Sequence, residues 1–250
     1  MFKKFNIFIG IILLAIFLTP TTLVNAASSS SVHNEAELKQ ALTNESISNI
    51  VLANDIETTE KINILRPVTI DGANHTIKYI GTFGKDNSKD NTIWGGIYVL
   101  QVYKTNATIK NIKLTGGNAG LLINGSTVKF EGTIDVSSNG FGGIELGKGN
   151  NVTTTPSLIL DGNSKIINTT ESASRPTIWV PKDTSLAILE INGVRFNLDA
   201  NEELTIDLIN ELANTIENPN TSDSLMGYLF FIVLPLSLVY FITKKIKLYS

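Results

Sequence analysis

Residues 108–146 read TIKNIKLTGGNAGLLINGSTVKFEGTIDVSSNGFGGIEL. Short runs of Ile, Leu, Val and Thr alternate here with Gly, Asn, Asp and Ser, a pattern typical of short strands bounded by tight turns. Apolar pairs recur in two interleaved series with a spacing of about 20 to 24 residues. The first series is Ile112/Leu114, Ile134/Val136 and Leu158/Leu160, and the second is Leu121/Ile123, Ile144/Leu146 and Ile166/Ile167. A repeat of this length favours a solenoid, in which stacked coils bury one continuous apolar column.

The rest of the middle of the chain continues this pattern and predicts an all-β domain. We expect strands at 49–52, 62–65, 68–70, 75–79, 97–103, 108–114, 120–123, 127–130, 133–136, 142–146, 157–160, 166–168, 177–180 and 187–196. A helix is expected at 34–43, with Asn34 or His33 as its cap, and a second at 200–217 with an apolar stripe. The favoured fold is a parallel β-helix. A two-sheet sandwich stays open as the alternative, and it would show antiparallel hairpins.

Three segments carry a resemblance to a known fold family. They are ELKQAL at 37–42, IVLANDI at 50–56 and VTIDGANHTI at 68–77. In this order they resemble the opening of pectate-lyase-like right-handed β-helix domains, and residues 106–145 resemble the inner coils of such domains. The resemblance implies a right-handed parallel β-helix at 33–198, closed by the N-terminal helix, with residues 199–217 as a helical cap or stalk.

The N-terminal 26 residues have the composition of a secretory signal peptide. Lys3 and Lys4 precede an apolar run of about 14 residues, and Val24 and Ala26 supply small residues for cleavage. That run is shorter than the roughly 20 residues that a membrane-spanning helix needs, which disfavours a permanent membrane helix. The polar segment at 28–32 is expected to be a flexible leader. We therefore expect an exported protein.

The C-terminal end carries a second apolar stretch, which predicts a transmembrane helix. Residues 225–243 contain no charge, and Lys244, Lys245 and Lys247 follow directly. Positive residues remain on the cytoplasmic side, so residues 244–250 should form a cytoplasmic tail with the β domain outside the cell.

Residues 218–223, just before this span, resemble a sortase cell-wall sorting signal. The expected recognition residues are Asn218, Pro219, Asn220, Thr221 and Ser222. Pro219 and Thr221 match the usual Leu-Pro-x-Thr-Gly pattern, whereas Asn218 and Ser222 depart from it. The resemblance implies a Gram-positive surface protein with sortase and peptidoglycan as partners. A C-terminal membrane anchor that is never cut is the alternative.

Composition excludes several function classes. The net charge of −3 argues against a nucleic-acid partner, which needs a basic surface. The chain has no cysteine, so it has neither a thiol nucleophile nor a cysteine zinc site. With only two histidines, His33 and His75, we expect no metal and no cofactor.

The acidic and basic residues suggest no catalytic centre. The chain has three arginines, Arg66, Arg175 and Arg195, and its Asp71 and Asp161 stand in Asp-Gly turns, where Asp bonds its own backbone. Glu131, Asp135 and Glu145 are the carboxylates considered for catalysis. We therefore expect a non-catalytic, adhesin-like or structural surface protein. The alternative is a polysaccharide lyase or glycoside hydrolase, which requires such carboxylates to converge on one groove.

One loop and three aromatic residues are the expected ligand contacts. Trp94, Tyr98 and Tyr103 lie in or beside the longest loop, residues 81–96. Loops held by a rigid scaffold carry function, and aromatic rings suit stacking on sugars. Packing in the core or at a sheet edge is the alternative role of these rings, and the pattern favours it. The expected ligand is a glycan or a protein.

Overall fold

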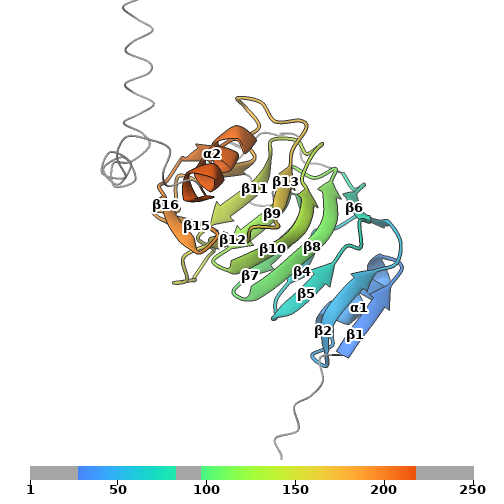
Figure 1. The fold of residues 1–250 in the computed structure, drawn as a ribbon. Coiled ribbons are helices and arrows are strands. Elements are labelled where there is room, and N and C mark those ends of the chain that lie inside the picture. The colour runs from blue at the N-terminus through green and yellow to red at the C-terminus, as the bar shows by residue number, and fades with distance from the viewer. Residues whose placement is uncertain (1–27, 83–96, 218–250) are drawn as a thin grey trace, which may run out of the picture.

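The chain forms a stack of coils in which each coil contributes up to three short strands (Figure 1). The computed structural model describes residues 28–82 and 97–217. The main path of the larger sheet, sheet A, consists of β1 (Ser28–Val32), β2 (Ile47–Leu52), β5 (Val68–Asp71), β8 (Asn106–Thr115), β10 (Thr127–Asp135), β12 (Ser157–Leu160), β15 (Ala187–Ile191) and β16 (Val194–Leu198). A side arm of sheet A adds β3 (Ile56–Thr58), β6 (Thr76–Tyr79) and β13 (Lys165–Ile167). Sheet B consists of β4 (Ile62–Ile64), β7 (Tyr98–Tyr103), β9 (Ala119–Asn124), β11 (Gly142–Gly147), β14 (Ile178–Trp179) and β17 (Glu203–Leu204).

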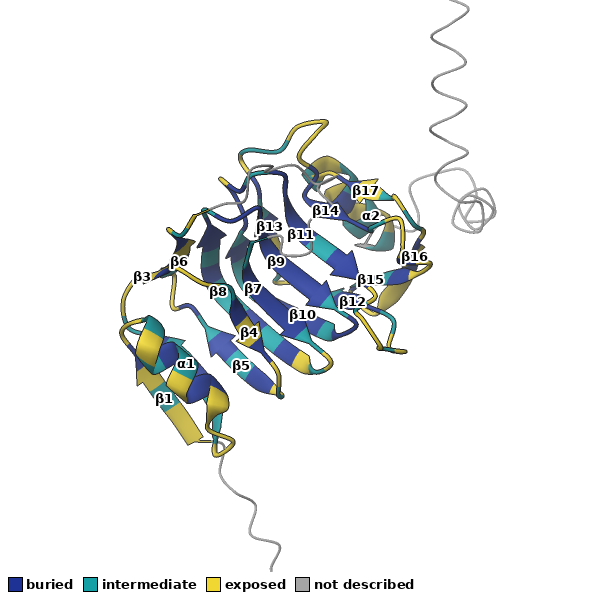
Figure 2. Ribbon diagram, turned by 180° about the vertical axis from the view of Figure 1, so that it is seen from behind, coloured by how far each residue is buried: buried dark blue, intermediate teal, exposed yellow. Residues whose placement is uncertain are grey.

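Parallel pairing holds the coils together and confirms the all-β class. Ile50 pairs with Ile70, Ile70 with Ile109, and Ile109 with Phe130, all in parallel strands. These four side chains are fully buried and belong to one apolar core cluster. Figure 2 shows that buried segments recur on neighbouring strands along the stack. Among the named strands of the described ranges, antiparallel pairing occurs at β15–β16 and β14–β17 only, and a single antiparallel bridge joins Ser172 and Arg175. The sandwich alternative is therefore wrong.

The long strands β8 and β10 turn a corner partway along their length. Asn111 and Gly132 have positive φ values of 42° and 69° at this corner. A Cβ atom at Gly132 would lie 2.0 Å from Asn111 Oδ1, so glycine is required there. The sequence predicted 127–130 and 133–136 as two strands. The structure joins them because pairing with β8 continues on both sides of the corner.

The predicted spacing is correct for the middle coils and wrong after residue 147. Ile112 pairs with Ile134, and Leu121 pairs with Ile144, as the repeat predicts. Leu158, however, pairs with Val128 rather than continuing from Ile134. The segment between β11 and β12 adds residues 148–156 as a loop, and a count along the chain cannot distinguish such an insertion from a change of period.

The same insertion misaligns the second apolar series. Ile166 pairs with Ile134 in sheet A, whereas the partner of Ile144 in sheet B is Ile178. The prediction that Ile144/Leu146 and Ile166/Ile167 are equivalent positions is therefore wrong, because they belong to different sheets.

The strand predicted at 187–196 is a β-hairpin. Asn192 and Gly193 have φ values of 51° and 81°, which suit a two-residue hairpin turn. β16 therefore folds back on β15, as an antiparallel last strand of sheet A. An Asn-Gly pair between apolar runs is the sequence signal that was missed. The sequence also missed the short strand β3.

Helix α1 (Glu35–Thr43) covers the N-terminal end of the stack, and Asn34 caps it as predicted, with Glu37 N–H donating to Asn34 Oδ1 at 3.0 Å. The prediction of a flexible leader at 28–32 is wrong. These residues form β1, which pairs in parallel with β2 and buries Val32. Serine composition concealed the strand, because backbone hydrogen bonds require no apolar side chain. The domain thus starts before residue 33.

Helix α2 (Ile206–Glu217) packs on the C-terminal end and starts later than the predicted residue 200. Residues 203–204 form β17 instead, because their backbone pairs with the open edge of β14. Leu208, Leu212 and Ile216 pack against the core. No helix in the described part of the chain is long and apolar enough to cross a membrane. The predicted signal peptide, sorting motif, membrane span, basic tail and Trp94 lie outside the described residues.

Candidate functional site

Tyr98 and Glu145 meet on the outer side of sheet B. The Tyr98 hydroxyl donates a hydrogen bond to Glu145 Oε2, and burial of the carboxyl raises the pKa of Glu145 to about 7. The hydrogen bond from Tyr98 and the charge of Lys61 oppose this rise, while the charge of Asp183 adds to it. Burial and the neighbouring Glu145 also raise the pKa of Tyr98. At neutral pH, Tyr98 and Glu145 are therefore hydrogen-bonded to each other within the protein.

Aromatic side chains pack beside the Tyr98–Glu145 pair. Phe141 lies edge-on to Tyr98 at 6.3 Å and to Trp179 at 5.1 Å between ring centroids. The register places Gln101, Leu122, Glu145 and Trp179 across neighbouring strands of sheet B. Since Gln101, Leu122 and Trp179 are buried, the middle of the outer side of sheet B does not face solvent.

Tyr103 lies in a more open place at the end of β7. Its hydroxyl donates to the backbone carbonyl of Asn150 at 2.9 Å, and Lys104 Nζ lies 5.0 Å from the ring centroid. Lys104 N–H donates to the carbonyl of Asn124 at 3.4 Å. We call Tyr103, Lys104, Asn124 and Asn150 the Tyr103 patch. It combines a ring and an amide from the ends of β7 and β9 with a cation and an amide from the connections that follow β7 and β11.

The structure places the expected contact residues in different environments. Both tyrosines are half-buried and both hydroxyls bond within the protein, Tyr98 to the part-buried Glu145 carboxylate and Tyr103 to the carbonyl of the exposed Asn150. That these residues contact a ligand stays a prediction. The sequence could not separate their roles, because the partner Glu145 comes from a strand 47 residues away.

The three acidic residues considered for catalysis do not converge. Glu131 pairs with Lys110 at 2.5 Å and with Lys129 at 2.9 Å, and Asp135 pairs with Lys113 at 3.2 Å. Both stand on β10 of sheet A, whereas Glu145 stands on β11 of sheet B. Hydrogen bonds from Lys110 and Lys129 lower the pKa of Glu131. These carboxylates are arranged as partners of lysines.

The arginines and turn residues also have local partners. Arg66 donates to the carbonyls of Leu42 and Ala41, at the end of α1, and Arg195 pairs with Glu190 at 3.2 Å. As predicted, Asp71 and Asp161 accept hydrogen bonds from their own turns, from Ala73 N–H and Asn163 N–H. His75 approaches Asp55 at 3.3 Å. Within residues 28–82 and 97–217, no group of three His, Cys, Asp or Glu side chains could hold a metal ion.

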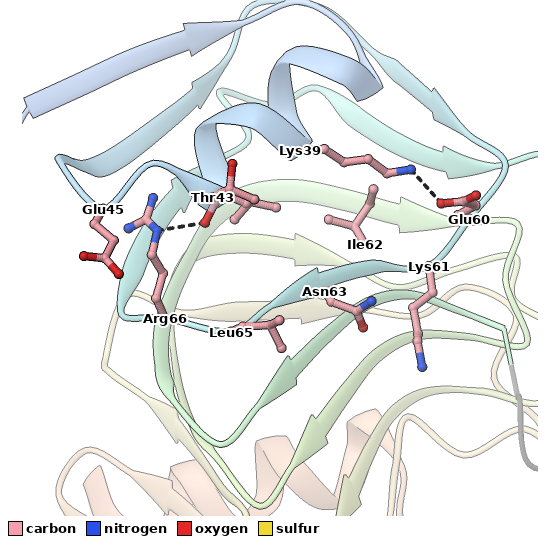
Figure 3. A pocket seen from close by; sticks show the side chains of 10 residues that line it. Lys39, Thr43, Glu45, Glu60, Lys61, Ile62, Asn63, Leu65 and Arg66 are labelled. Carbon is pink, nitrogen blue, oxygen red and sulfur yellow. Dashed lines mark hydrogen bonds and ion pairs between the residues drawn. The ribbon is translucent and has the colours of Figure 1, made fainter.

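A groove between α1 and β4 is a feature that the sequence did not indicate. It has a volume of about 520 Å³. Figure 3 shows the α1 residues Lys39 and Thr43 on one side and the β4 segment on the other. Its lining residues are Lys39, Leu42, Thr43, Glu45, Glu60, Lys61, Ile62, Asn63, Leu65 and Arg66.

Comparison with known proteins gives one family and one solved structure. The family model described as "Putative pectate lyase-like adhesive domain" matches residues 29–129. The solved structure "L. reuters 100-23 SRRP" is similar at 20% sequence identity and a TM-score of 0.42, and the match covers 66% of this chain and 59% of that one. No protein with a curated function matches this chain.

Proposed function

We propose that this chain is a surface-displayed, adhesin-like protein that works by binding. The observation that carries the proposal is the match of residues 29–129 to a family described as adhesive. The pairing of Glu131 and Asp135 with lysines, away from Glu145, supports a role without catalysis, because lyase or hydrolase chemistry needs converging carboxylates. The parallel pairing of successive coils supports a right-handed parallel β-helix as the displayed scaffold.

The ligand surface that we propose is the Tyr103 patch. Tyr103 offers part of an aromatic ring, Lys104 an exposed ammonium and Asn150 an exposed amide. Such a combination suits a glycan or a polar protein surface, because a ring packs on an apolar face while amides and the cation bind oxygen atoms. The rigid strands behind the patch fix these groups before the ligand arrives, which lowers the entropic cost of binding.

The proposed attachment to the cell is covalent. Residues 1–26 direct export, and the apolar span 225–243 with Lys244, Lys245 and Lys247 holds the chain in the membrane. A sortase cysteine thiolate attacks the carbonyl of Thr221 and forms a thioester while residues 222–250 leave with a new amino group. An amine of peptidoglycan then attacks the thioester, forms an amide with Thr221 and releases the thiol.

Wall fractionation with mass analysis of the C-terminus tests the attachment. We expect wall-bound protein that ends at Thr221, and we expect Thr221→Ala to leave the full chain in the membrane fraction. A matched change outside the motif, Thr215→Ala, should leave wall attachment unchanged. Recovery of intact residues 222–250 on mature wild-type protein would contradict the sorting proposal.

Adhesion of cells that display the chain tests the binding role. Cells are compared on immobilised host-type glycans and on extracellular-matrix proteins. Tyr103→Ala should reduce adhesion, whereas Lys129→Ala in sheet A should leave it unchanged. Equal adhesion by cells with and without the chain would refute the adhesive role, and loss in both variants would refute the choice of patch.

A further inference from the structure

Sheet B ends at β4 with an open edge, one strand earlier than sheet A, which ends at β1. In sheet A, β1 pairs with β2 and adds a strand at this end of the stack. Sheet B has no strand at that level, because the chain between β1 and β2 forms α1. Among the described residues, the backbone of residues 61–65 forms hydrogen bonds to no element other than β7. The N–H and C=O groups on the other side of β4 are thus available to another strand.

The side chains of this edge alternate between core and solvent. Ile62 and Ile64 are fully buried, whereas Asn63 is exposed and Leu65 is 65% exposed. Lys61 lies on the same side as Asn63 and Leu65, by the two-residue period of an extended chain. The groove of about 520 Å³ runs beside these residues and separates them from α1 (Figure 3). It offers the space that an added strand would need.

The charges in the groove leave one cation without a close partner. Lys39 pairs with Glu60 at 2.9 Å, and Arg66 donates to the α1 carbonyls. Lys61 has no carboxylate within 4.0 Å among the described residues, although Glu145 attracts it from further away. In Figure 3 its side chain extends away from the Lys39–Glu60 pair. Partial burial also lowers the pKa of Lys61, so a bound carboxylate would stabilise its charged form.

We propose that the edge of β4 binds an extended segment of a partner protein, which adds a strand to sheet B. The segment carries a carboxylate opposite Lys61, a polar side chain opposite Asn63 and an apolar side chain opposite Leu65. Backbone hydrogen bonds supply affinity, and the alternate side chains supply specificity. This surface is separate from the Tyr103 patch, so the inference does not depend on the glycan or protein bound there.

A second copy of the chain is a poorer occupant of the same edge. A two-fold axis through Asn63 would pair the two β4 strands in antiparallel fashion. This arrangement places Lys61 of one copy opposite Leu65 of the other, twice, and so sets a cation against an apolar side chain in both halves. The pattern of charge and exposure therefore fits a different protein better than it fits itself.

Synthetic peptides test the proposal on the full-length chain in detergent. The probes are fluorescein-labelled peptides with the sequences Asp-Val-Thr-Val-Leu and Leu-Val-Thr-Val-Asp, since the added strand can run in either direction. We expect one of them to bind, as measured by fluorescence polarisation, and to slow hydrogen exchange at residues 61–65. The same peptide with alternate amides N-methylated should lose binding, because it can no longer complete the strand ladder.

Charge reversal identifies the site. Lys61→Glu should weaken binding of the acidic peptide by about tenfold, and a peptide with Lys in place of Asp should recover it. The matched control is Lys78→Glu on β6, which should change neither the affinity for the acidic peptide nor the affinity for the peptide with Lys in place of Asp. The proposal is wrong if neither peptide binds, if N-methylation has no effect, or if the two lysine variants behave alike. It is also wrong if the chain dimerises through this edge, so that Leu65→Ser converts a dimer to a monomer.

Discussion

The hydroxyl of Tyr98 on β7 donates a hydrogen bond to the carboxylate of Glu145 on β11, across the intervening strand β9. This contact joins two coils that are 47 residues apart in the chain. It also leaves a carboxyl group in a place where burial raises its pKa to about 7. The pair therefore couples the packing of sheet B to the protonation of the Glu145 carboxyl.

The pH dependence of stability should reveal this coupling. Glu145 titrates near 4.5 in the unfolded chain and near 7 in the folded one, so between these values the folded protein holds a proton that the unfolded chain has released. The free energy of unfolding must then fall as the pH rises from about 4.5 to about 7, by about 3 kcal/mol from this group. Urea unfolding of Glu145→Gln should show a flatter profile than wild type over this range. Parallel profiles would contradict the raised pKa.

Removal of the hydroxyl should expose the cost of the unpaired carboxylate. Tyr98→Phe should lower the free energy of unfolding by about 1–3 kcal/mol, and more at pH 8 than at pH 5, because the charged form of Glu145 suffers most. Tyr103→Phe is the matched control. Its hydroxyl bonds a carbonyl near the surface, so the loss should be smaller. Equal losses would show that the carboxylate is well solvated.

The strand β1 should contribute to stability in spite of its serine composition. Val32 is fully buried, so Val32→Ala should cost about 2 kcal/mol in chemical unfolding, whereas Ser29→Ala at an exposed position should have little effect. If Val32→Ala left the unfolding midpoint unchanged, residues 28–32 would behave as the leader that the sequence predicted.

The carboxylate of Glu171 should hold the start of α2. It accepts a hydrogen bond from the backbone N–H of Ile206 at 2.8 Å and another from the Thr177 hydroxyl. Glu171→Ala should therefore cost about 1 kcal/mol, as the loss of a helix cap does. Hydrogen exchange should accelerate in residues 206–217, while Glu211→Ala on the same helix should leave it unchanged. Unaltered exchange in both variants would show that α2 is held by its apolar contacts alone.

Several parts of this fold could be predicted from local pattern. The Asn34 cap, the Asp71 and Asp161 turns and the spacing from Ile112 to Ile134 depend on residues close together in the chain or on one uninterrupted repeat. The prediction of a flexible leader at 28–32 and the predicted spacing beyond residue 147 were wrong, because pairing partners there are decided by the neighbouring coil. The Asn192-Gly193 pair indicates a hairpin turn, but the apolar residues on both sides of it favoured one continuous strand.

The sequence by itself determined that this chain stacks short strands, because turn residues and apolar pairs recur at the length of one coil. It did not determine which carboxylates meet which partners. Only the tertiary structure separated Glu131, bound to lysines on sheet A, from Glu145, buried beside Tyr98 on sheet B. Only the tertiary structure left one side of β4 without a strand partner, since the chain between β1 and β2 forms α1 and adds no strand to sheet B. The reason is physical: periodicity fixes what each coil buries, whereas contacts between coils depend on the three-dimensional register.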